Sequence, residues 1–122
     1  MRVTRRDGDH RGMVTVELAV GFVTATFLTA TLCAVVLLGV AQSACARTST
    51  EMARQLARGD VTAAGVAQSE APRHADVEVD RGPGGVEVSV SVGVSILGMG
   101  DVVVRSERWA AWEPGVSSET SG

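Results

Sequence analysis

A long run without charged residues dominates the first half of the chain. Residues 18–46 contain no Asp, Glu, Lys or Arg, and their most apolar part, residues 18–41, covers 24 positions. Because a bilayer core of about 30 Å needs about 20 apolar residues in a helix, this segment is long enough to span a membrane with some tilt. Four threonines lower the hydrophobicity of this segment, but a threonine hydroxyl bonds readily to a backbone carbonyl of the preceding helical turn.

The helical pattern continues past the uncharged run with one apolar and one charged side. The residues that share the apolar side are Cys45, Met52, Ala53 and Leu56. Gly59 supplies a stop, so we expect one helix from about residue 14 to residue 58. A short second helix is expected over residues 61–69, with Asp60 as its N-terminal cap.

The last third of the chain changes to a period of two residues. Valines alternate with acidic residues over 76–80 and with mostly polar residues over 86–96, and the glycine-rich segment 81–85 reads as a turn. A third strand is expected from residue 102 to about residue 111. The predicted fold class is α+β, with a long N-terminal transmembrane helix, an amphipathic continuation and a small antiparallel sheet of about three strands. The Met52 and Leu56 side of the helix is its expected cover.

Charge divides the chain into four predicted parts. All 11 basic residues are arginines, and four of them precede residue 13. Since positive charge favours the cytoplasmic side, residues 1–12 are expected to be a cytoplasmic leader and 13–46 the transmembrane helix. Residues 47–113 then form an extracytoplasmic α+β domain, and 114–122 a disordered tail. Without the leader, 7 arginines stand against 12 acidic residues, and no basic patch for nucleic acid is evident.

No set of catalytic residues assembles from this sequence. His10 and His74 are the only histidines, and both thiols lie in the long helix, so no nucleophile and base pair is expected. Asp76, Glu78 and Asp80 offer oxygen ligands, but on the solvent side of a strand they lack a loop that would bring them together. We therefore expect no enzyme, no cofactor and no metal site.

The cysteines and tryptophans are interpreted from their spacing. Cys33 and Cys45 would lie about 18 Å apart on a continuous helix, beyond the reach of a disulfide, and are expected to be small packing residues. Trp109 and Trp112 have opposite parity in a regular strand, so one of them is expected to face outward. They either mark an edge that binds a partner or close a core with few aromatic residues.

The most informative feature is a glycine and a lone carboxylate at the start of the apolar run. Gly12 follows the arginine-rich leader, and Glu17 is the fifth residue counted from Met13. A carboxylate at the start of a membrane-spanning helix has a high free-energy cost of desolvation unless it is paired with a positive charge. Cleavage after Gly12 would create an ammonium group on Met13 that can serve as the partner.

This pattern resembles the TadE-like pseudopilins and minor pilins of the tight adherence type IV pilus system. The resemblance covers residues 11–60, through the segments 13–19, 41–44 and 53–59, and implies a pilin-like fold. It also implies cleavage after Gly12 by a prepilin peptidase, and registry of subunits through Glu17 and the new N-terminus. The implied partners are membrane lipid, the peptidase and other pilin-like subunits. Many relatives have a proline where this chain has Val23, and the major pilins favour tyrosine at the position of Leu18. The second departure and the larger extra-membrane domain favour a minor pilin or pseudopilin over the main fibre subunit.

Small residues recur at every fourth position of the apolar run, where another helix can approach closely. They are Gly21, Ala25, Thr29 and Cys33. Two other interpretations remain open. One is a secreted β-rich binding domain released by signal peptidase after Ala46. The other is an uncleaved single-pass accessory subunit.

Overall fold

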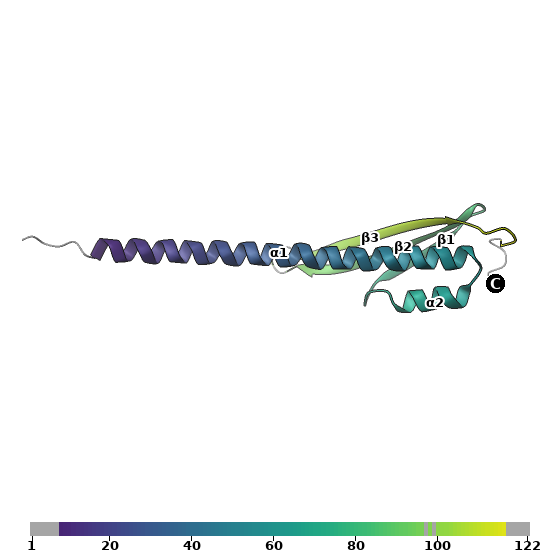
Figure 1. The fold of residues 1–122 in the computed structure, drawn as a ribbon, viewed down its shortest axis with the longest axis horizontal. Helices are drawn as coiled ribbons and strands as arrows, with labels where there is room; N and C mark the ends of the chain where they lie inside the picture. Colours follow the sequence, from purple (N-terminus) through teal and green to yellow (C-terminus); the bar gives the residue numbers. More distant parts are fainter. Residues whose placement is uncertain (1–7, 97, 99, 117–122) are drawn as a thin grey trace, which may run out of the picture. The chain divides into compact units, whose positions relative to one another are not determined.

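The computed structural model describes residues 8–96, 98 and 100–116, and the first seven residues of the predicted leader lie outside that part. Two helices are followed by three strands, in the order α1 (Gly8–Ala57), α2 (Val61–Ser69), β1 (Asp76–Arg81), β2 (Gly85–Ile96) and β3 (Gly100–Ala111) (Figure 1). The chain divides into two compact units, one ending at Val36 and the other beginning at Leu37.

The long helix begins earlier than the sequence predicts. It starts at Gly8 rather than near Val14, so Gly12 and Met13 are helical, and it passes Val23 without interruption. No proline occurs before Pro72, and among residues 8–14 only the glycines lower helix propensity strongly. The expected start near Val14 was based on the end of the charged leader. A change of charge along the chain does not by itself prevent a helix from forming.

α1 ends at Ala57, two residues before Gly59, which the sequence predicts to stop the helix. Gly59 has a φ of 76°, and its N–H donates to the Leu56 carbonyl at 2.9 Å while the Asp60 N–H donates to the Gln55 carbonyl at 3.0 Å. This pair of bonds is the Schellman arrangement, which needs a left-handed residue and so favours glycine. Asp60 then caps α2, because its Oδ1 accepts from the Ala63 N–H at 2.9 Å. The predicted second helix and its cap are confirmed.

The sheet is antiparallel, with β2 in the centre and β1 and β3 at the edges. In the register, Asp76 lies opposite Ser91 and Arg81 opposite Val86, while Gly85 lies opposite Ala111 and Ile96 opposite Gly100. The three predicted strands are confirmed. The first turn is shorter than predicted, since Arg81 and Gly85 extend the strands on either side of it.

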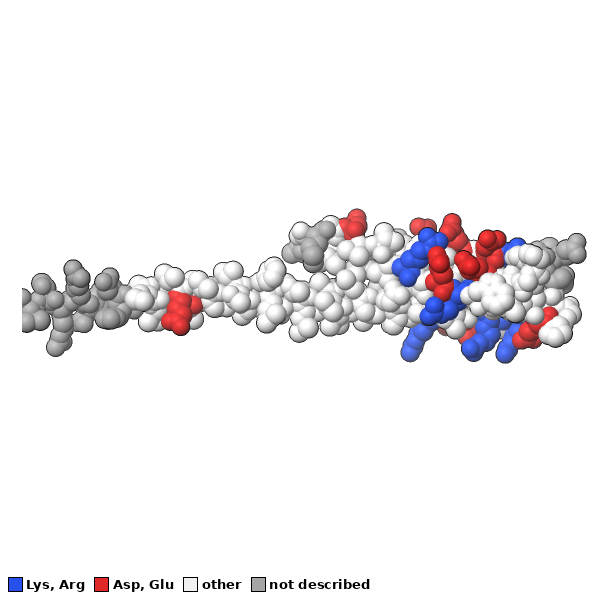
Figure 2. Space-filling model, turned by 90° about the horizontal axis from the view of Figure 1, so that it is seen from above, with Lys and Arg blue, Asp and Glu red and all other residues white. Residues whose placement is uncertain are grey.

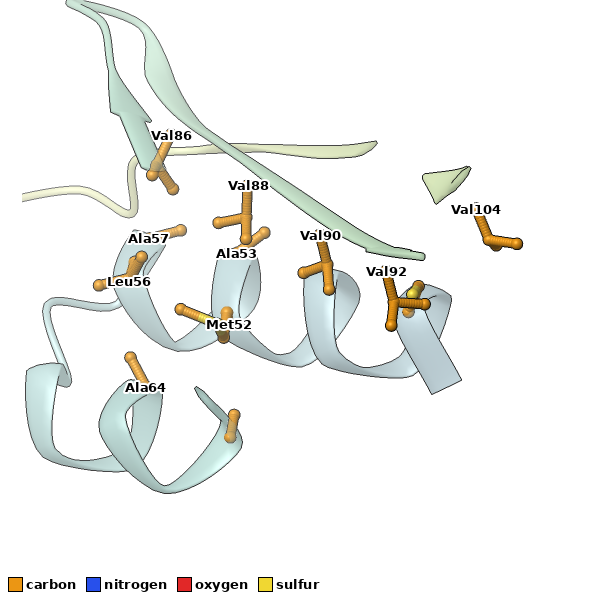
Figure 3. Packing of buried hydrophobic residues seen from close by; sticks show 12 residues of the cluster. Met52, Ala53, Leu56, Ala57, Ala64, Val86, Val88, Val90, Val92 and Val104 are labelled. Carbon is orange, nitrogen blue, oxygen red and sulfur yellow. The ribbon is translucent and has the colours of Figure 1, made fainter. Parts of the chain in front are cut away.

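The core of the second unit lies between the valine face of the sheet and α1, as predicted. Figure 3 shows Met52, Ala53, Leu56 and Ala57 of α1 beside the valines of β2, with Ala64 of α2 on the far side of Met52. Among the described residues, the largest fully buried side chains are Val86, Val88, Val90, Cys45 and Ser49. Leu38 and Ala41 pack against this cluster, so the core begins well before the predicted end of the apolar segment at residue 46.

The segment after β3 closes the unit. The Trp112 indole N–H donates to the Gly82 carbonyl at 2.8 Å, and the Glu113 N–H donates to the Ala57 carbonyl at 3.0 Å. These bonds join the end of the sheet to the first turn and to the end of α1. The Val116 N–H bonds the Glu113 carbonyl, and residues 117–122 of the predicted tail lie outside the described part.

Candidate functional site

The unit that ends at Val36 presents an apolar helical surface. In the described residues it consists of α1 alone, and its large apolar side chains from Met13 to Val36 are 57–74% exposed. Within the described part of the chain, one helix is long and apolar enough to cross a membrane, and it lies near the N-terminus. Leaving one such side chain in water forgoes about 1.5–3 kcal/mol of burial free energy, so burial of this surface in an apolar environment is favourable.

The hydroxyl groups on this surface are satisfied within the helix. Thr24, Thr26, Thr29 and Thr31 each donate to the carbonyl four residues earlier, at 2.8–2.9 Å. An unpaired hydroxyl would be costly in hydrocarbon, and these bonds remove that cost without a partner chain. The sequence-based expectation for the four threonines is confirmed.

The predicted processing and registry residues all lie on exposed helical turns. Gly12 and Met13 precede Glu17 on the same helix, and Met13 and Glu17 are four residues apart, so they lie one turn from each other on neighbouring positions. Glu17 is exposed and is the only charged residue from Met13 to Ala46. Pairing of Glu17 with an ammonium group at Met13 stays a prediction.

The predicted packing stripe is open along its length. Gly21, Ala25, Thr29 and Cys33 are all exposed, and a Cβ added at Gly21 would meet nothing within 4 Å. Both cysteines are free; Cys45 is buried in the core, whereas Cys33 remains on the stripe. Packing of the stripe against a second helix stays a prediction.

Comparisons with protein-family models, with curated proteins and with solved structures find no match for this chain.

The acidic residues of β1 lie on the solvent side of the sheet, as predicted. Asp76, Glu78 and Asp80 are exposed and alternate with half-buried valines. Glu78 lies 3.4 Å from the Arg105 guanidinium, which also pairs with Glu107 at 2.8 Å. In the part of the chain that is described, no group of three or more His, Cys, Asp or Glu side chains is placed to hold a metal ion.

The two tryptophans differ in burial, which confirms that one faces outward. Trp112 is half-buried and packs against the core, whereas Trp109 is 62% exposed. A Cβ added at Gly85 would collide with the backbone carbonyl oxygen of Ala110 and would come within 2.7 Å of Cζ2 of the Trp109 ring. Glycine is therefore required at position 85 by the close approach of the β3 backbone and, in addition, by the Trp109 ring.

Two features of the second unit were not predicted. The hydroxyl groups of Ser49 and Ser106 lie 3.3 Å apart in the buried layer between α1 and β3. An open groove of about 1100 Å³ runs between α1 and α2, lined by residues that include Val40, Arg47, Glu51, Val66 and Glu70. Periodicity predicts which face of a helix or strand carries a serine. It does not predict that the face of α1 with Ser49 packs against the face of β3 with Ser106.

Proposed function

We propose that this chain is a membrane-anchored structural subunit of a pilus-like assembly, of the minor pilin or pseudopilin type. The observation that supports this most is an apolar segment of α1 whose large side chains from Met13 to Val36 are 57–74% exposed, with a single carboxylate, Glu17, near the start of that segment. The apolar segment holds the subunit in the bilayer. In the assembly the same surface packs among the helices of other subunits.

Maturation in this proposal is cleavage after Gly12, which leaves Met13 as the N-terminus. The helix includes this bond, so the peptidase must first unwind residues 8–12. Gly12 makes unwinding easier, since a glycine in a helix interior costs roughly 1 kcal/mol relative to alanine. Gly8 is the first residue of the helix, where helix ends fray. The new ammonium group pairs with Glu17 in a charge-assisted bond and fixes the stagger between neighbouring helices.

The buried face of α1 argues against release by signal peptidase after Ala46. Cys45 is fully buried, and Leu38 and Ala41 pack against the same core. Cleavage there would remove these side chains from the domain it releases. The helix segment available to lipid accordingly ends near residue 37, which leaves residues 14–37 to cross the membrane.

The intact mass of the chain purified from its native cells, from both the membrane fraction and the surrounding medium, tests the proposal. We expect a protein that begins at Met13. A chain that begins at Arg47 would support the secreted domain. A chain that keeps its first twelve residues would support an uncleaved accessory subunit, and either result would overturn the proposed maturation.

A further inference from the structure

One end of the sheet in the second unit carries little charge. Residues 88–100 contain no Asp, Glu, Lys or Arg, and neither do residues 37–46 of α1. Charges resume in α1 at Arg47, and the acidic strand β1 begins only at Asp76. Asp101 in β3 is the exception. Figure 2 shows the charged side chains of this unit crowded together, with a broad uncharged surface beside them.

This uncharged end of the sheet lies beside the first residues of the unit. Figure 3 shows that the valines of β2 follow α1 from its last turn back toward its N-terminus. Ser49 contacts Ser106, which lies opposite Val90. From there β2 extends six residues to Ile96, or about 20 Å, and α1 extends twelve residues back to Leu37, or about 18 Å. Ile96 and Leu37 therefore lie at the same level within this unit, at what we call the Ile96 end.

Leu37 directly follows the segment that is proposed to span the membrane. The second unit begins at Leu37, and the residue before it, Val36, is the last of the exposed apolar segment on the same helix. In the proposed function that segment lies in lipid. The continuity of the chain then brings the Ile96 end to the surface of the bilayer, and the inference rests on the proposed function in this respect alone.

The large side chains exposed at the Ile96 end are apolar. Leu37 and Val40 of α1 are 57% and 61% exposed, and Val103 of β3 is 70% exposed. Val103 lies opposite Gly93, and it precedes the buried Val104, so it lies on the face of the sheet turned away from α1. Moving such side chains out of water is favourable, and a lipid surface beside them offers that environment.

Two features limit how deeply this end can enter lipid. From Val92 to Ile96, β2 pairs with β3 alone, because β1 reaches only as far as Ser91. Backbone groups left open among these strands would lose water in hydrocarbon without gaining a partner. Asp101, whose carboxylate accepts from the Ser95 hydroxyl, is a charge that hydrocarbon also disfavours. Water and polar head groups satisfy both, so this end suits the head-group layer and not the acyl chains.

We propose that the Ile96 end of the second unit rests in the head-group layer of the bilayer that holds α1. The contact surface consists of Leu37 and Val40 on α1 and of Ile96 and Val103 on the sheet. It attaches the unit to lipid at a second point beside the helix and restricts its tilt against the membrane. The subunit must give up this contact when it leaves the bilayer for the proposed assembly.

Fluorescence quenching of the full chain, diluted into phosphatidylcholine vesicles, tests this contact. In a Cys33→Ser background, separate chains carry Val103→Cys, Glu107→Cys or Val20→Cys, each labelled with the same NBD fluorophore. Cys45 is left in place because it is fully buried. Glu107 is the matched control, since it is exposed on the same face of β3 and lies farther from the Ile96 end. The quenchers are a nitroxide on the lipid head group, a nitroxide in the middle of the acyl chain, and iodide in the water.

We expect the head-group nitroxide to quench the label at position 103 at least about threefold more than the label at position 107, because four strand residues separate them by about 13 Å. The label at position 103 should respond less to the acyl-chain nitroxide than to the head-group nitroxide. The label at position 20, within the apolar segment, should respond most to the acyl-chain nitroxide.

Equal head-group quenching at positions 103 and 107 would overturn the contact, as would iodide quenching at position 103 as strong as at position 107. A label at position 103 that is protected from all three quenchers would indicate cover by another protein chain and would also overturn it. The label at position 20 distinguishes the two proposals. Acyl-chain quenching there without head-group quenching at position 103 contradicts this contact alone, whereas no acyl-chain quenching at position 20 contradicts the membrane anchor itself.

Discussion

Ser49 is a polar side chain in the most buried layer of the second unit. Its hydroxyl lies 3.3 Å from the Ser106 hydroxyl and 3.2 Å from the Ala46 carbonyl, and no part of the residue is exposed. A pair of hydroxyls in this position satisfies each member, so a change to one member affects both. The pair lies where α1 crosses β3, and it connects two elements that are distant in the sequence.

Ser49→Ala should therefore destabilise the second unit by about 1–3 kcal/mol, because Ser106 loses its partner in a buried site. The double variant Ser49→Ala with Ser106→Ala should cost less than the sum of the single variants. Denaturant unfolding of the full chain in detergent, followed by tryptophan fluorescence, measures this, since both tryptophans lie in the second unit.

The matched control for this prediction is Ser43→Ala. Ser43 lies on the same helix and makes a similar local bond, to the Val40 carbonyl at 2.9 Å, but it is exposed. Its replacement should change stability by less than about 0.5 kcal/mol. Equal effects at Ser43 and Ser49 would show that the contact with Ser106 contributes nothing.

At the scale of elements, Asp60 joins two helices through one residue. Its N–H completes the end of α1, and its carboxylate caps α2, which holds Ala64 and Ala67 against the core. α2 has nine residues, too few for a stable helix in isolation, so it depends on its cap and on this packing. The element is small, and a single local contact decides much of its stability.

Asp60→Ala should loosen α2 by about 0.5–2 kcal/mol, the usual range for loss of an N-cap. Faster hydrogen exchange at the amides of residues 63–69, with little change in β2, is the expected observation. Asp60→Asn is the control, because asparagine also caps helices well. If both variants exchange alike, the side-chain bond to Ala63 does not stabilise α2.

The elements of the second unit could be predicted because each has a strong local signal. Alternating valines specify the strands, and Gly59 with Asp60 marks the boundary between the helices. The start of α1 could not be predicted well, because no residue near Gly8 or Gly12 forbids a helix. Which tryptophan turns inward was also undetermined, since it depends on β3 ending at Ala111 and on a bond from Trp112 to the distant Gly82. The Ser49 and Ser106 contact needs the tertiary structure.

At the scale of the whole molecule, the candidate site is a surface that one copy of the chain leaves open. The sequence places Glu17, the apolar segment and the small-residue stripe on one helix. The structure adds that Glu17, the stripe and the large apolar side chains from Met13 to Val36 are exposed. Their partners are lipid and other chains in the proposal, so their roles depend on interactions between molecules. These roles remain predictions until assembly is measured.

Glu17→Ala should leave membrane insertion intact, because it removes a charge from an apolar segment, but should prevent incorporation into the assembly. Recovery of the chain in filaments sheared from its native cells, relative to the membrane fraction, measures this. Glu51→Ala is the matched control, since Glu51 is an exposed acid on the same helix whose described contact is with Gln55. Normal incorporation of the Glu17→Ala chain would remove the registry role.

A second experiment distinguishes pairing of Glu17 with the Met13 ammonium group from a general requirement for a negative charge at position 17. If Glu17 acts through the ammonium group of Met13, then a chain whose cleavage is blocked by Gly12→Leu lacks the partner of the carboxylate. Adding Glu17→Ala to that chain should cause no further loss of incorporation, because the interaction is already absent. A further severalfold loss in the double variant would show that Glu17 contacts some other group.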